Sequence, residues 1–324
     1  MTNMKKTLLV GAVAFWLNQG AYAVDEWDMP TPYGDRNFQT ANIRAFADDV
    51  EKNTDGALRI TVHSAGSLIR HPEIRNAVRR GLVPIGEILM SRLGNEDSVF
   101  EIDSVPFLAT DYRQAKALWE ASSPVIRARL EEAGLELLFA VPWPPQGIYA
   151  NREVRKVDDL AGMKLRVYNA ATERLAGLMN AVPTQVEVPD IPVAFASGRV
   201  EAMITSPSTG ANTKSWDYVS HFHDTRAWLP KNMVIVNRKA FMGLDAEVRE
   251  TVLAAAQRAE ERGWTASMAE TDAKIAVLRE NGMTVVMPDA ELTEGLRAIG
   301  RTMAGEWSAR AGEAGQAILD AYRQ

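Results

Sequence analysis

Strand patterns and helix patterns alternate along almost the whole chain, and this alternation restricts the fold more than any other feature. Apolar residues recur at helical spacing over 43–50, and apolar and polar residues then alternate as in a half-buried strand over 58–62. Because strands that alternate with helices are typical of parallel sheets, we expect an α/β protein with largely parallel sheets. The other predicted elements are strands at 84–90, 135–141, 163–167 and 200–204 and helices at 72–81, 111–132, 170–181 and 190–197.

The length of the chain predicts two lobes that are closely connected. Its 324 residues suffice for about two domains, and no Pro/Gly/Ser-rich linker, repeat or low-complexity tract separates them. Two α/β lobes without a flexible linker favour strands that cross between the lobes. Residues 245–281 contain no proline and fit either two consecutive helices, with a kink at Gly263, or one helix that braces both domains. Residues 289–324 predict a further amphipathic helix.

The first 23 residues have the pattern of a secretory signal peptide. Lys5 and Lys6 precede an apolar stretch over 7–17, and Ala21-Tyr22-Ala23 is a small-x-small cleavage site. The alternative is an N-terminal anchor helix, although the stretch is shorter than the roughly 20 apolar residues that a span needs. We expect cleavage after about Ala23 and a periplasmic location, and loss of the two lysines would change the net charge from −6 to −8.

The composition argues against several classes of function. The chain has no cysteine, which excludes thiol catalysis, disulfides and Cys-ligated metals, and its acidic balance disfavours nucleic-acid binding. Neither a phosphate-binding GxxxxGK[ST] loop nor a GxSxG nucleophile elbow is present. His221 and His223 would share one face of a strand, but no acidic partner completes a metal-ligand spacing. We therefore expect no enzyme, no catalytic residue, no metal and no cofactor.

The segment 162–172 (GMKLRVYNAAT) carries the strongest indication of function. Arg166 lies on a predicted strand just before a turn into a helix, and the ends of such strands form the usual ligand crevice. A guanidinium there has the fork of donors that pairs with a carboxylate through two hydrogen bonds. Asn169 is placed to cap the next helix, whose first amides also favour an anion. The alternative is an arginine that faces solvent on an alternating strand.

This segment resembles the part of the substrate-binding P-subunit of tripartite ATP-independent periplasmic (TRAP) transporters, the DctP family, that carries the substrate-binding arginine. The resemblance extends over essentially the whole chain after residue 23, and the order of its motifs matches that family. The other similar segments are 56–60 (GALRI), 66–68 (GSL), 105–108 (VPFL), 181–184 (AVPT), 198–201 (GRVE) and 229–244.

The resemblance implies a two-lobed periplasmic binding protein with crossing strands and a long helix that braces both lobes. We expect lobe I to comprise residues 24–147 and about 234–278, and lobe II residues 148–233 and about 279–324. The lobes would close on a small organic acid by hinge motion, and the closed form would deliver that acid to the membrane permease subunits. We expect a monomer. A secreted enzyme that metabolises acids and a sensor module remain alternatives.

Two departures from the family pattern bear on the ligand. Members that bind sialic acid carry an arginine where this chain has Tyr149, which argues against that ligand, and either Thr205 or Ser206 stands where many members have asparagine. Aromatic side chains are the remaining candidates for the wall of the cleft, although each could instead pack in the core. This surface favours an aromatic or apolar monocarboxylate, with a sugar acid or a C4-dicarboxylate as alternatives. The aromatic candidates are Tyr33, Trp143, Tyr149, Tyr168 and Trp216.

Overall fold

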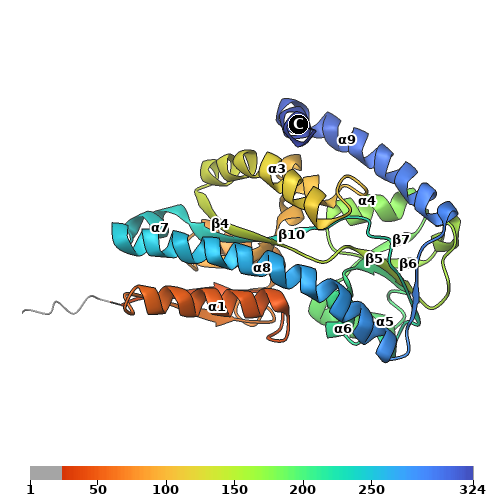
Figure 1. Ribbon diagram of the computed structural model, residues 1–324, viewed down its shortest axis with the longest axis horizontal. Coiled ribbons are helices and arrows are strands. Elements are labelled where there is room, and N and C mark those ends of the chain that lie inside the picture. Colours follow the sequence, from red (N-terminus) through yellow and green to blue (C-terminus); the bar gives the residue numbers. More distant parts are fainter. Residues whose placement is uncertain (1–23, 324) are drawn as a thin grey trace, which may run out of the picture.

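The computed structural model describes residues 24–323, so the predicted signal peptide lies outside the described residues. Figure 1 shows a mixed α/β chain whose long helices pass over two groups of strands. The strands are β1 Asp25–Pro30, β2 Leu58–His63, β3 Ile85–Leu89, β4 Leu135–Pro142, β5 Gly147–Ala150, β6 Lys164–Val167, β7 Val182–Gln185, β8 Ala202–Thr205, β9 His221–His223, β10 Lys231–Asn237 and β11 Thr284–Val286.

The helices account for most of the remaining chain. The α-helices are α1 Phe38–Asn53, α2 His71–Arg79, α3 Tyr112–Glu132, α4 Ala170–Leu178, α5 Ile191–Ala196, α6 Pro207–Asn212, α7 Arg238–Gly243, α8 Ala246–Glu280 and α9 Ala290–Tyr322. The 3₁₀ helices are η1 Met90–Leu93, η2 Ser98–Ser104, η3 Val157–Leu160, η4 Val188–Asp190 and η5 Ser215–Asp217.

Polar side chains at the helix starts explain where several helices begin. The side chain of Asn37 accepts a hydrogen bond from the amide of Gln39 at the start of α1, and Asp111 accepts one from Gln114 at the start of α3. Such caps satisfy amides that have no partner inside the helix. The helix α2 begins with a proline in its first turn and is followed by Gly81, whose φ of 70° suits glycine.

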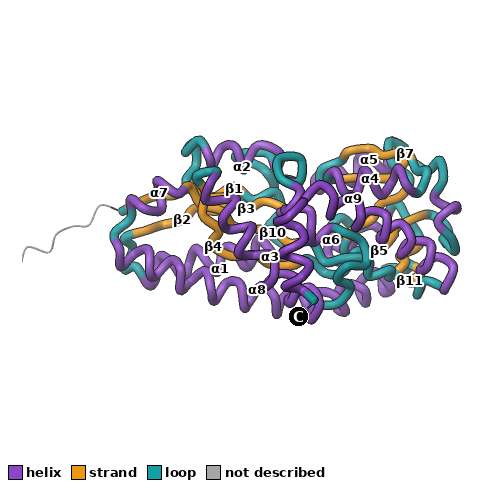
Figure 2. Tube along the Cα trace, turned by 90° about the horizontal axis from the view of Figure 1, so that it is seen from above, coloured by secondary structure: helices purple, strands orange, loops and turns teal. Residues whose placement is uncertain are grey.

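The chain folds into two lobes, which are separated along the long axis in Figure 2. Lobe I contains the two-stranded sheet β1–β2 and the three-stranded sheet β3–β10–β4. Lobe II contains one six-stranded sheet in the order β11–β9–β5–β8–β6–β7. The expected two-lobed α/β fold with crossing strands is confirmed, because β4 of lobe I leads into β5 of lobe II and β9 of lobe II leads back into β10 of lobe I.

The expectation of largely parallel sheets is wrong, because each lobe receives one antiparallel strand from the other. The strand β10 pairs antiparallel with both β3 and β4, and β5 pairs antiparallel with both β8 and β9. A crossing strand enters its new lobe from the side of the other lobe, whereas its neighbouring strands run toward that side. The crossing strand therefore points against its neighbours in the sheet.

This arrangement brings many chain segments to the boundary between the lobes. The parallel strands end there, and the two crossing strands begin there, so the loops that flank all of them lie at one place. Ligands of open α/β sheets bind beyond the carboxyl ends of the strands. The topology therefore creates a site to which both lobes contribute.

The region 245–281 forms one continuous helix rather than two. The helix α8 contacts α1 and β4 in lobe I and α6 and β11 in lobe II, so it braces both lobes as the resemblance implied. Gly263 lies inside this helix and is buried against β4, where a Cβ atom would overlap the side chain of Val141 and lie 2.8 Å from Nδ2 of Asn42. The glycine therefore permits the close approach of α8 to the sheet.

The helix α9 also connects the lobes, which bears on the predicted lobe boundaries. It contacts α4 in lobe II and α3 and η2 in lobe I, and its backbone is not helical at Gly312. The assignment of residues 279–324 to lobe II therefore stays a prediction, and so do the lobe boundaries near residues 148 and 234. The antiparallel pairing of lobe I already begins at Lys231.

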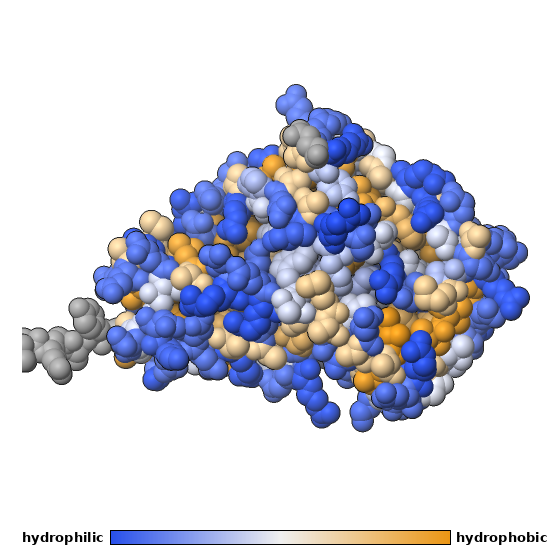
Figure 3. Space-filling view, viewed as in Figure 1, coloured by the Kyte–Doolittle hydropathy of each residue, from blue (hydrophilic) through white to orange (hydrophobic). Residues whose placement is uncertain are grey.

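Polar and charged residues cover most of the face that Figure 3 shows, and apolar residues gather mainly toward its lobe II end. Over residues 24–323, none of the helices combines the length and the hydrophobicity that a membrane span requires.

Substitution of Gly263 by alanine should destabilise the protein by about 1–2 kcal/mol, because overpacking at Val141 outweighs the better helix propensity of alanine. Gly305→Ala is the matched control, since no atom lies within 4 Å of a Cβ at that position of α9. It should stabilise the protein by up to about 1 kcal/mol. Denaturant unfolding of both variants measures the difference, and equal effects would contradict this packing argument.

Candidate functional site

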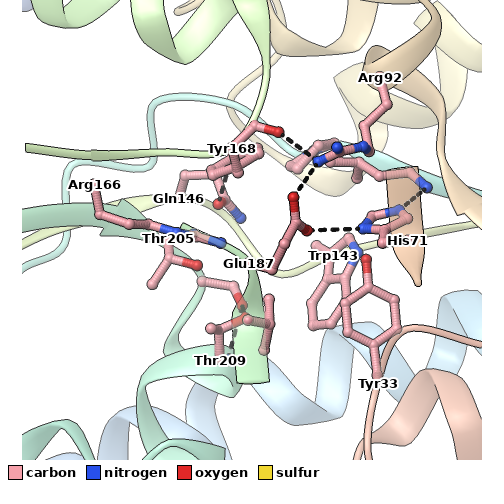
Figure 4. Close-up of a pocket in the computed structure, with 14 residues that line it drawn as sticks. Tyr33, His71, Arg92, Trp143, Gln146, Arg166, Tyr168, Glu187, Thr205 and Thr209 are labelled. Carbon is pink, nitrogen blue, oxygen red and sulfur yellow. Dashed lines mark hydrogen bonds and ion pairs between the residues drawn. The ribbon is translucent and has the colours of Figure 1, made fainter. Parts of the chain in front are cut away.

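A cavity with about 400 Å³ of empty space lies between the lobes, and both lobes supply its walls. Figure 4 shows the side chains that converge on it. Its lining comprises Tyr33, His71, Leu89, Arg92, Trp143, Gln146, Arg166, Tyr168, Glu187, Val188, Thr205, Ser206, Thr209 and Pro230.

The structure brings six of the nine candidate residues to this one cavity, whereas Trp216 packs against the hydrophobic core of lobe II. Tyr33 follows β1 and Trp143 follows β4, so these two rings come from the strand ends of lobe I. The other four lie within or just after strands β6 and β8 of lobe II, and they are Arg166, Tyr168, Thr205 and Ser206. Their roles in ligand binding stay a prediction.

Arg166 is the most distinctive group in the cavity. Its side chain is buried, and its Nε donates a hydrogen bond of 3.0 Å to the carbonyl oxygen of Val186. The guanidinium carbon lies 4.7 Å from the centre of the Tyr168 ring, within the range of a cation–π contact. Within residues 24–323, no carboxylate lies within 4 Å of the guanidinium nitrogens of Arg166. Burial lowers the pKa of this guanidinium. The cavity therefore contains a buried positive charge without a paired carboxylate of the protein.

Asn169 and Tyr149 lie outside the lining, each for a packing reason. The Asn169 side chain accepts a hydrogen bond from the amide of Thr172 as the cap of α4 and donates one of 2.6 Å to Oγ of Ser91 in the other lobe. Tyr149 is fully buried beside Phe222, at 4.7 Å between ring centres, and its hydroxyl donates to the carbonyl oxygen of Ser206. Tyr149 therefore contacts the lining residue Ser206 from behind, whereas Asn169 caps α4 and connects the two lobes.

A group of three charged or polar side chains joins the lobes at the cavity. The carboxylate of Glu187, after β7 of lobe II, lies 3.0 Å from Nη1 of Arg92 and 3.4 Å from Nδ1 of His71, which both belong to lobe I. Burial alone would raise the pKa of Glu187, but the His71 hydrogen bond and the Arg92 charge outweigh it and lower that pKa to about 2. Nη1 of Arg92 also donates to the carbonyl oxygen of Tyr168. Glu187 is therefore ionised at neutral pH.

These three residues were not predicted from the sequence, although Arg92 and Glu187 share with Arg166 a position near the end of a strand. Arg92 lies in η1, three residues after the end of β3, and Glu187 lies two residues after the end of β7, so both follow strand ends at the boundary between the lobes. His71 begins the helix α2, which follows no strand directly. No short motif links the three positions.

The comparison with known families identifies the fold. The family model "Bacterial extracellular solute-binding protein, family 7" (DctP) matches residues 31–307. The chain belongs to this family. The resemblance to TRAP transporter receptors is therefore confirmed, and the members are extracytoplasmic receptors that bind small organic acids and work with a membrane permease.

Solved structures of this family superpose on the whole receptor. DctP7 of Bordetella pertussis, an extracytoplasmic solute receptor binding pyroglutamic acid, is 46% identical, covers 93% of this chain and 100% of its own, and has a TM-score of 0.92. A marine metagenome TRAP protein specific for pyroglutamate is 38% identical, with 93% and 99% covered and a TM-score of 0.91. A Sulfitobacter TRAP protein with bound β-D-galacturonate is 18% identical, with 92% and 99% covered and a TM-score of 0.84, so it shows the fold alone.

A buried hydrogen-bond network holds the aromatic wall of the receptor's cavity in place. Oδ1 of Asn232 accepts hydrogen bonds from the Tyr33 hydroxyl at 3.2 Å and from Nε1 of Trp143 at 2.9 Å. Its Nδ2 donates at 2.7 Å to Glu87, which also accepts a hydrogen bond from the Thr31 hydroxyl. Glu87 is buried, and desolvation raises its pKa to about 7 despite these two hydrogen bonds.

The raised pKa of Glu87 predicts a pH-dependent stability. The group ionises near its ordinary value of 4.5 when the chain is unfolded and near 7 when it is folded, so the folded state binds more protons between these values. Its contribution to stability is therefore greatest below pH 4.5 and decreases by roughly 1 kcal/mol per pH unit up to about 7.

Glu87→Gln should remove this decrease while keeping a side chain that can bond to Asn232 and Thr31. The unfolding free energy of the wild type, relative to that of the variant, should therefore fall between pH 5 and pH 8 in denaturant titrations. Glu173→Gln, on an exposed position of α4, is the control. A difference between wild type and Glu87→Gln that is constant across this pH range would contradict the assignment.

Proposed function

We propose that this protein is the periplasmic receptor of a TRAP transporter and captures pyroglutamate, or a closely similar small cyclic monocarboxylate, between its lobes. Arg166 would pair with the carboxylate, and the receptor would then deliver the ligand to the membrane permease. Cleavage of a signal peptide after about Ala23 and action as a monomer belong to the same proposal. So does the absence of catalysis, of a cofactor and of nucleic-acid binding.

The buried guanidinium of Arg166 is the observation that carries the proposal. Burying an ion removes its hydration, which costs free energy. A paired opposite charge and additional hydrogen bonds are needed to offset this cost. A ligand carboxylate would provide both, and the fork of guanidinium donors suits two parallel hydrogen bonds. A charge-assisted hydrogen bond contributes about 1.5–3 kcal/mol, out of the roughly 8 kcal/mol of a micromolar complex.

The choice of pyroglutamate rests on similar receptors and on the character of the cavity. Three structures at 46%, 42% and 38% identity are described as binding pyroglutamate. This ligand is a small lactam with one carboxylate, one ring N–H and one ring carbonyl. Gln146, Thr205 and Ser206 offer polar groups for the lactam, and the rings of Tyr33 and Trp143 offer apolar contact. The sequence favoured an aromatic or apolar monocarboxylate. Pyroglutamate likewise has a single carboxylate, but its ring is a lactam rather than an aromatic ring.

Arg166→Ala should weaken pyroglutamate binding at least tenfold, because it removes the partner of the carboxylate. Arg166→Lys should bind with intermediate affinity, since it keeps the charge without the fork. Arg174→Ala is the control, because this arginine of α4 is half exposed and pairs with Glu306. Isothermal titration calorimetry measures the three dissociation constants, and an unchanged value for Arg166→Ala would refute the role of this residue.

Pyroglutamate should raise the melting temperature of the protein by several degrees. A ligand at a hundred times its dissociation constant stabilises the folded state by about 2.7 kcal/mol. A thermal-shift screen with pyroglutamate, aromatic acids, uronates and C4-dicarboxylates compares the alternatives directly. Stabilisation by a uronate or a dicarboxylate, without any by pyroglutamate, would replace the proposed ligand.

The enzyme alternative has little support in the site. Glu187 is held ionised by Arg92 and His71, and it is thereby a weak base. Chromatographic analysis of purified protein with pyroglutamate should recover the acid unchanged, and conversion to another compound would favour the enzyme.

A further inference from the structure

The charges that line the cavity balance to a single positive charge. Arg92 and Arg166 are the cations of the lining, and Glu187 is its carboxylate. Burial lowers the pKa of His71, so this imidazole is neutral. Glu187 therefore neutralises one of the two guanidiniums, and the other remains for a ligand.

Hydrogen bonds fix how the neutral His71 and Glu187 interact. Nε2 of His71 accepts a hydrogen bond of 3.1 Å from the amide of Leu89, so the proton of the ring must lie on Nδ1. That Nδ1–H faces one oxygen of Glu187 at 3.4 Å, and Nη1 of Arg92 donates to the other oxygen at 3.0 Å. The carboxylate is thus held from two sides at the cavity (Figure 4).

We propose that Glu187 is a specificity-determining residue that makes the cavity accept one ligand carboxylate and reject a second. This inference rests on the proposed function, because it concerns the ligand of the same site. A second ligand carboxylate would meet the like charge of Glu187 in a desolvated space. The charge of Arg92, which could otherwise attract a second carboxylate, is already paired with Glu187.

Glu187 also connects the lobes, and the test must separate this role from ligand selection. The chain offers a matched control three residues away. Asp190 of lobe II pairs with Arg70 of lobe I at 3.1 Å, and both side chains are exposed and lie outside the cavity lining. Asp190→Asn therefore removes an ion pair between the lobes without changing the charge of the cavity.

The decisive probes are glutarate and its monoamide, glutaramate. The two molecules have the same carbon skeleton, but glutarate has two carboxylates, whereas glutaramate has one carboxylate and one amide. Calorimetry, with competition where binding is weak, measures both ligands and pyroglutamate on the wild type, Glu187→Gln and Asp190→Asn. The wild type should prefer glutaramate over glutarate at least tenfold, and Asp190→Asn should retain that ratio. Glu187→Gln should lower the ratio at least tenfold, because Arg92 becomes free to pair with the second carboxylate.

Equal affinities of the wild type for the two probes would overturn the inference, and this comparison needs no variant. An unchanged ratio in a folded Glu187→Gln protein, as judged by circular dichroism, would also overturn it and leave Glu187 as a contact between the lobes. Failure of pyroglutamate to bind the wild type, with the preference for glutaramate intact, would refute the proposed ligand and support the role of Glu187.

Discussion

The charge of Arg166 is the feature on which the account of this site depends. The guanidinium is buried between the lobes with one carbonyl and one aromatic ring as its protein partners. These contacts offset only part of the several kcal/mol that desolvation of an ion costs. A ligand anion is the natural complement, so the protein contains one half of an ion pair and the solute would supply the other.

The crossing strands determine where this charge can lie. Because β5 and β10 each enter the opposite lobe antiparallel to their neighbours, the ends of the parallel strands and the starts of the crossing strands meet at one boundary. Side chains from seven or more separate segments can therefore surround a small solute. Contacts between the lobes also form there, including Glu187 with Arg92 and Asn169 with Ser91. The helix α8, packed closely at Gly263, connects the two halves along their length.

The sequence predicted the parts of this structure that local patterns encode. The α/β class, five of the eleven strands within residues 24–323 and most of the α-helices follow from periodicity, and Arg166 follows from a guanidinium at a strand end within a family motif. The direction of β5 and β10 was not predicted, because a strand's own pattern does not specify its neighbours. The single helix α8 was one of two open alternatives, since Gly263 weakens a helix by propensity but is required by its packing.

The composition of the site was harder to predict than its location. His71, Arg92 and Glu187 come from three distant segments, and their interaction depends on how the two lobes are placed. Tyr149 occupies the position at which some family members carry a ligand-binding arginine. In this protein its ring packs in the core behind Ser206, because Gly210 leaves room for it there. A one-dimensional pattern identifies a residue at the end of a strand, whereas burial and pairing decide whether it faces the cavity.

A crystal structure of the protein with pyroglutamate tests the central claim most directly. The account predicts that the ligand carboxylate lies within about 3 Å of two nitrogens of the Arg166 guanidinium, as in a bidentate pair, with the lobes closed around the lactam ring. A carboxylate bound to Arg92, with Arg166 making no contact to the ligand, would contradict it.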